Sequence, residues 1–125
     1  MAMRIVDSQA HIWYPNTPER PWSSARPEVK PHRNRPFFVL EDLLAEMRAA
    51  GVARVILTQA VFEGERIDKM IEAVRLYPDL FAIIDHFRLQ IPETREKMTA
   101  WKPQSGILGV RVSFLHDAVI SLCAS

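Results

Sequence analysis

Residues 3–13, MRIVDSQAHIW, begin as a hydrophobic strand and end in polar groups at alternate positions. Because successive side chains of a strand point to opposite faces, this spacing predicts that Asp7, Gln9 and His11 share one face. An acid, an amide and an imidazole are costly to bury without partners. Such a group is typical of the mouth of an α/β barrel, where ligands bind at the carboxyl ends of the strands.

Helices and strands alternate along the rest of the chain. The sequence predicts three further hydrophobic strands, at residues 53–61, 80–87 and 107–114. It predicts three helices before them, at residues 40–50, near residues 67–74 and from Pro92 to about Trp101. Alternation of this kind implies right-handed crossovers and a parallel sheet, whose apolar strands are buried on both faces. The predicted fold class is α/β, of the (β/α)8 barrel type, with about the first four strands and three helices present.

A long proline-rich loop interrupts this alternation at residues 14–38. It contains six prolines, a density that prevents regular helix or sheet. A loop of this length within a compact domain is usually a lid or a binding loop, or else it is disordered. Because it follows the strand that carries His11, we expect the functional role. We treat residues 1–125 as a single partial barrel domain with this loop inside it.

Composition excludes several classes of partner and site. The formal net charge is +1 and the basic residues are scattered, so we expect no nucleic-acid partner and no membrane partner. The sole cysteine, Cys123, cannot form an internal disulfide or a thiolate metal site. No apolar signal-peptide core is present near the N-terminus, and the expected location is cytoplasmic.

Polar residues that interrupt the predicted strands are the candidates for chemistry. They are Asp7, Gln9, His11, Thr58, Gln59, Asp85, His86, Arg111 and Ser113. A neutral imidazole binds divalent metal or exchanges protons near neutral pH, which makes His11 the leading catalytic candidate and a candidate zinc ligand. Arg111 lies among apolar neighbours and should face a carboxylate, from either the protein or an anionic substrate.

Two further groups support the candidate site. The amide of Gln9 is suited to orienting a ligand, a water molecule or the His11 ring, although it replaces an imidazole ligand poorly at a zinc site. Trp13 and Trp22 border the proline-rich loop and are expected to wall a pocket for a planar or cyclic substrate. Packing of the loop on the barrel rim explains both aromatic residues equally well. His86 and Asp85 are adjacent on a strand, so at most one of them points inward.

Four segments together resemble the amidohydrolase-related family of the amidohydrolase superfamily. They are IVDSQAHIW at residues 5–13, TPERPW at 17–22, LLAEMRAAGV at 43–52 and GVRVSF at 109–114. The family includes lactonases of the dicarboxylate-pyrone type and metal-dependent decarboxylases of aromatic acids. The resemblance implies a (β/α)8 barrel with a His-x-His pair ending strand one, histidines on strands five and six, and an aspartate on strand eight. His11 matches the second histidine of the pair, and Gln9 stands at the first.

The resemblance implies a hydrolase that acts on a lactone, an ester or a C–N bond of a small carboxylated substrate. Arg111 would anchor the substrate carboxylate, and His11 would polarise or position the carbonyl. One divalent metal of the zinc type is the implied cofactor, which the Gln9 substitution disfavours. Because the family's later histidines and aspartate have no counterpart here, we expect this chain to be an inactive N-terminal fragment.

Two alternatives remain open at this level. The first is a non-catalytic α/β half-barrel that self-associates through its open sheet edges. The second is a metal-dependent decarboxylase of the same superfamily. A concentration-dependent change in hydrodynamic size would support the self-associating half-barrel.

Overall fold

The computed structural model describes residues 3–24, 26–89 and 92–114, and the statements below concern these residues. The strands are β1 (Ile5–Ala10), β2 (Val52–Leu57), β3 (Phe81–Phe87) and β4 (Ile107–Val112). The α-helices are α1 (Leu40–Ala50), α2 (Asp68–Leu76) and α3 (Pro92–Ala100). Two short 3-10 turns, η1 (His32–Asn34) and η2 (Val61–Glu63), lie in the connections.

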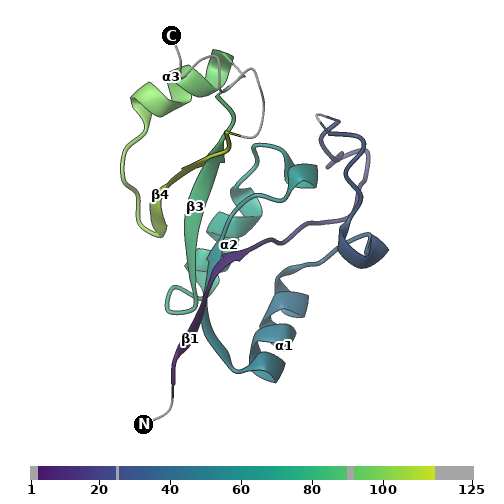
Figure 1. Cartoon of the computed structure of the whole chain (residues 1–125), viewed down its shortest axis with the longest axis vertical. Helices are drawn as coiled ribbons and strands as arrows, with labels where there is room; N and C mark the ends of the chain where they lie inside the picture. The colour runs from purple at the N-terminus through teal and green to yellow at the C-terminus, as the bar shows by residue number, and fades with distance from the viewer. Residues whose placement is uncertain (1–2, 25, 90–91, 115–125) are drawn as a thin grey trace.

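The four strands form one sheet in the order β1-β2-β3-β4, and every neighbouring pair is parallel (Figure 1). Each crossover passes through a helix, with α1 between β1 and β2, α2 between β2 and β3, and α3 between β3 and β4. Sequential order of parallel strands with helical crossovers is the arrangement of one sector of a (β/α)8 barrel. The predicted fold class and its four strands and three helices are therefore confirmed.

The hydrophobic core lies between the sheet and its helices. Side chains that point from β2 and β3 toward the helices are almost completely buried, among them Leu57, Ile83 and Phe87. Helix α1 packs on β2 and α2 packs on β3. Helix α1 ends as its sequence predicts, because Gly51 adopts a left-handed φ of 71° and closes the last turn.

The opposite face of the sheet is open, which corrects the expectation that the strands are buried on both faces. Arg54 and Arg111 are exposed, and Ile56 and Ile84 are only half-buried. This face would line the interior of a closed barrel, and four strands alone cannot close around it. Ile71 of α2 is also more exposed than its helical spacing predicts, at 43%.

Strand β1 contains an irregularity that the period-two reading missed. Asp7 pairs with Val55 and Ala10 pairs with Leu57, so three steps along β1 match two along β2. Asp7 and His11 consequently line one cavity beside β1, whereas Gln9 lines a hollow on the open face. The prediction that Asp7, Gln9 and His11 share a face is wrong, because the register shift breaks the alternation.

Among the described residues, no helix is both long enough and apolar enough to cross a bilayer. His116 and Cys123 lie outside the described residues.

Candidate functional site

Three sequence-predicted residues gather at the carboxyl ends of the strands. His11 directly follows β1, His86 lies in β3, and Arg111 lies in β4. His86 and Arg111 are register partners in the parallel ladder, so their side chains leave the sheet on the same face. The electrostatic effects of Arg111 and of His11 both reach the His86 ring. The sheet therefore brings two imidazoles and a guanidinium from three strands to one end.

A hollow of about 380 Å³ lies on the open face beside this cluster. Its walls include Gln9, Thr58, Ile84 and Arg111. The Oγ1 atom of Thr58 is buried and has no hydrogen-bond partner among the described residues. A buried hydroxyl without a partner is costly, and a polar group of a ligand in this hollow would satisfy it.

The position of His11 fixes its tautomer. Its ring Nδ1 lies 2.9 Å from the backbone carbonyl oxygen of Thr58. Because a carbonyl oxygen only accepts, Nδ1 carries the proton and donates, and Nε2 of the neutral ring holds a lone pair. Nε2 can therefore accept a proton from water or bind a metal ion. A neutral His11 cannot donate from Nε2 to a substrate carbonyl, which revises the polarising role expected for it.

Both histidines are kept neutral by their surroundings. Burial is the main cause that lowers the pKa of His11 below its usual 6.5, and the nearby charge of Arg111 adds to it. The hydrogen bond to Thr58 opposes this effect. Burial likewise lowers the pKa of His86, reinforced by Arg111 and Arg88 and opposed by Asp85. The two rings are therefore proton acceptors at neutral pH.

Arg111 forms no ion pair with any carboxylate of the described residues, and its side chain is exposed. The sequence left open whether its partner is a protein carboxylate or an anionic substrate. Within residues 3–24, 26–89 and 92–114, the first alternative has no support. The guanidinium fork is thus available to an anion that enters the hollow.

Asp85 and Gln59 belong to the helix side of the sheet rather than to the mouth. The Gln59 side chain donates to Asp85 Oδ1 at 2.6 Å and accepts from the backbone N–H of His86 at 2.8 Å. Lys97 of α3 lies 3.3 Å from the second oxygen of Asp85, which is 2% exposed. Asp85 and His86 do point to opposite sides, and Gln59 ties the end of β2 to the backbone that carries His86.

The aromatic candidates have packing roles. Trp13 is 4% exposed, and its ring lies 5.4 Å from that of Phe38 and 6.1 Å from that of Phe62. Trp22 is partly buried, with its ring 5.0 Å from Phe62 and its Nε1 donating to the Tyr14 carbonyl. Trp13 also forms one wall of a cavity of about 240 Å³ beside β1. Substrate binding by either tryptophan stays a prediction.

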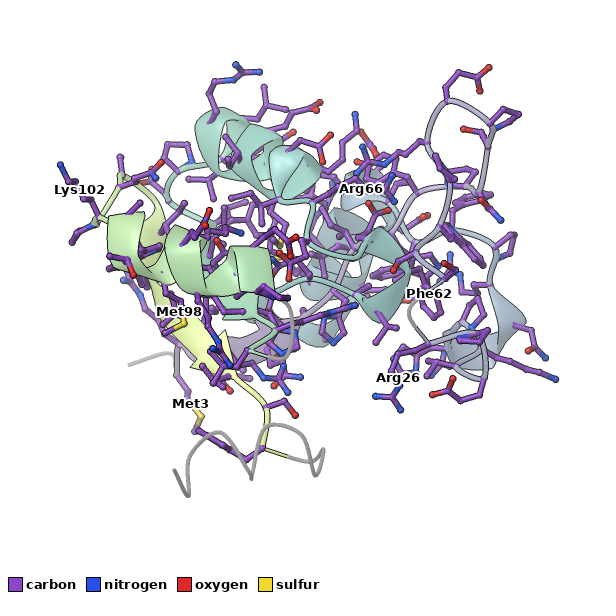
Figure 2. The ribbon with its side chains drawn as sticks, turned by 90° about the horizontal axis from the view of Figure 1, so that it is seen from above. Met3, Arg26, Phe62, Arg66, Met98 and Lys102 are labelled. Carbon is purple, nitrogen blue, oxygen red and sulfur yellow. The ribbon has the colours of Figure 1, made fainter. Side chains whose placement is uncertain are left out.

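The proline-rich loop is held down by an ion-pair cluster that the sequence analysis missed. Arg20 contacts Glu63 at 2.5 Å and Asp68 at 2.7 Å. Glu63 is 5% exposed and also accepts from the backbone N–H of Tyr14 at 2.9 Å. Figure 2 shows neighbouring Phe62 and Arg66 on the same side of the molecule as Arg26 of the loop, away from Met98 and Lys102. The only sequence feature that pointed to this ion-pair cluster was Arg20 within the TPERPW segment.

The described residues do not fit a catalytic zinc ion. Such a site needs three protein ligands with an open fourth position. Between residues 3 and 114, leaving out the undescribed positions 25, 90 and 91, no group of three His, Cys, Asp or Glu side chains is arranged to hold a metal ion. His11 supplies one suitable nitrogen, and Gln9 stands where the family pattern has its first histidine.

The lowered histidine pKa values predict a pH-dependent stability. Because both rings prefer the neutral form when folded, the unfolded chain binds more protons below the usual pKa of 6.5. The stabilisation is complete above 6.5 and decreases as the pH falls through the folded-state values. We expect the unfolding free energy in urea to fall between about pH 7.5 and about pH 5.5, and to fall less in His86→Gln. An equal decrease in both proteins would contradict this origin.

Comparison with known proteins identifies the fold. No family model and no curated protein sequence matches the chain. Three similar solved structures are a probable 2-pyrone-4,6-dicarboxylic acid hydrolase from Acinetobacter baumannii with citric acid bound, an apo protein from Agrobacterium tumefaciens and a zinc-bound amidohydrolase from Burkholderia multivorans. Their TM-scores are 0.59, 0.55 and 0.52, at 19%, 24% and 21% identity.

These matches cover most of this chain but less than half of each relative. They include 95%, 90% and 87% of this chain, and 44%, 38% and 37% of the respective solved chains. The comparisons confirm the fold that the resemblance implies, and the chain spans less than half the length of these solved structures.

Proposed function

We propose that this chain forms the N-terminal half of a barrel hydrolase of the amidohydrolase-related family. The substrate would be a small carboxylated lactone, ester or compound with a hydrolysable C–N bond. The observation that carries the proposal is the convergence of His11, His86 and Arg111 at the carboxyl ends of three strands, at one end of the sheet. Similar folds in a probable dicarboxylic acid hydrolase and an amidohydrolase support it.

In this proposal Arg111 binds the substrate carboxylate. Its exposed guanidinium has no acidic partner among the described residues and borders a hollow of about 380 Å³. Gln9 and Thr58 line the same hollow and would bind other substrate oxygens through the amide and the unpartnered hydroxyl. The Arg111 guanidinium together with the Gln9 amide and the Thr58 hydroxyl would fix the orientation of a small polycarboxylate.

His11 would act on the attacking water. Nδ1 is occupied by the Thr58 carbonyl, so the lone pair of Nε2 is free to hold or accept a proton from water. The resemblance places the principal base on strand eight, which this chain does not contain. We therefore expect residues 1–125 alone to bind a carboxylated ligand without appreciable turnover. No step is assigned to a metal ion, because the described residues do not form its ligand set.

Citrate is a suitable probe, since it carries three carboxylates and is bound by one of the structural relatives. Calorimetric titration of the chain with citrate should detect binding that Arg111→Ala weakens by about tenfold or more, as expected for a charge-assisted hydrogen bond worth about 1.5–3 kcal/mol. Arg95→Ala is the matched control, because Arg95 is an exposed arginine on α3. Absence of binding, or equal loss in both variants, would contradict the assigned role of Arg111.

A further inference from the structure

The sheet has two open edges. Strands β1 and β4 are its outermost strands, and each pairs on one side only with another strand of the described chain (Figure 1). Parallel sheets in soluble α/β proteins are normally covered on both faces, and exposed edges are usually protected by charges, prolines or overlying segments. Both edges of this sheet are therefore candidates for pairing with further strands.

Large aliphatic side chains are exposed on these two edge strands. Ile5 and Val6 of β1 are 45% and 53% exposed, and Leu108 and Val110 of β4 are 66% and 39% exposed. On the two central strands, by contrast, Val55, Leu57 and Ile83 are at most 2% exposed. Apolar surface is thus concentrated where new strands would have to add.

The partner that fits both edges at once is another half-barrel. An eight-stranded barrel needs four more strands that run in the same direction. A second copy, related by a two-fold axis parallel to the barrel axis, would place its β1 beside this β4 and its β4 beside this β1. The contact between β1 and β4 then forms twice in the dimer, as expected for a closed two-fold symmetric assembly. The solved relatives support the size of this assembly, because the chain covers only 37–44% of their length.

We propose that this chain pairs with a second copy of itself, β4 of each against β1 of the other, to close an eight-stranded barrel. All eight strands would point the same way. Each copy would consequently bring His11, His86 and Arg111 to one shared mouth, and the open face would become the barrel interior. The proposal rests on the sheet edges and holds whether or not the mouth hydrolyses a substrate.

Sedimentation velocity over a wide concentration range tests this pairing. We expect the wild-type chain of 14.4 kDa to sediment as a discrete dimer. Leu108→Lys, which puts a charge on the open-face side of the β4 edge, should shift the protein to monomer. Ile71→Lys is the matched control, because Ile71 is also an exposed aliphatic residue, at 43%, but lies on α2. A wild-type monomer, open-ended oligomers, or a Leu108→Lys dimer would overturn the proposal.

Cross-linking gives a second readout that does not depend on weakening the dimer. In a Cys123→Ser background, a chain with Val6→Cys is mixed with a chain with Leu108→Cys and treated with a short bis-maleimide. Val6 and Leu108 border one hollow together with Arg54 and Ile56 of the open face. We expect covalent heterodimers between the β1 and β4 edges. In the control mixture, Ile71→Cys replaces Leu108→Cys and should give far fewer. Equal yields in the two mixtures would overturn edge-to-edge pairing, and circular dichroism spectra establish that each variant is folded.

Discussion

Replacing Trp13 with alanine is expected to lower the unfolding free energy by about 3–5 kcal/mol. The indole is 4% exposed and is enclosed by Phe38, Phe62 and His32, with ring centroids 5.4, 6.1 and 6.0 Å away. Its Nε1 donates to the carbonyl of Arg35 at 3.1 Å. Alanine would leave a cavity and a carbonyl without this donor. The indole thus joins the end of β1 to the far end of the proline-rich loop.

Urea unfolding followed by circular dichroism at 222 nm would measure this loss, because the signal does not depend on tryptophan fluorescence. Trp22→Ala provides the comparison and should cost about 1–2 kcal/mol, since Trp22 is only partly buried. Trp13→Phe should recover part of the loss. A cost below about 1 kcal/mol for Trp13→Ala would show that the indole does not anchor the loop.

Removal of the Arg20 side chain is expected to release the proline-rich loop. Glu63 would remain buried with its Tyr14 N–H bond and a longer contact to Arg66 at 3.4 Å. Breaking a fully buried ion pair by removing one partner costs about 3–5 kcal/mol. Because these two contacts remain and the Arg20 side chain is 20% exposed, we expect Arg20→Ala to cost about 2–3 kcal/mol.

The loop itself supplies a precise proteolytic readout. Between residues 14 and 38, Arg33–Asn34 is the only bond after a basic residue that is not followed by proline, so trypsin has one favourable cleavage site there. Arg20→Ala should be cut at this bond several times faster than the wild-type chain. Arg26→Ala is the control, since Arg26 pairs locally with the exposed carboxylate of Glu28 at 2.7 Å. Equal cleavage rates for Arg20→Ala and the wild-type chain would contradict the anchoring role of Arg20.

Local patterns predicted the elements of this fold well. Apolar spacing predicts the helix at residues 40–50. Gly51 ends this helix because glycine readily adopts the left-handed backbone conformation that closes the last turn. Alternation of strands and helices predicts the parallel sheet, since right-handed crossovers leave few other topologies. The sequence predicts a strand at residues 53–61, but β2 already ends at Leu57, because the chain then turns into η2.

The features that the sequence did not predict depend on pairing between distant residues. The shift in β1 arises from its register against β2, which the period-two pattern cannot reveal. Arg20 and Glu63 are 43 positions apart, and their contact follows from how the loop folds over η2. Gln59 was expected at the mouth, but its amide turns toward Asp85 because a buried carboxylate needs a donor.

Histidine titration by NMR tests whether His11, His86 and Arg111 converge at one end of the sheet. In the wild-type chain both rings should titrate below 6.5. Because Arg111 lowers the pKa of both rings from a third strand, Arg111→Ala should raise both values, and Arg95→Ala should change neither. A wild-type pKa at or above 6.5, or values that do not move in Arg111→Ala, would contradict the site.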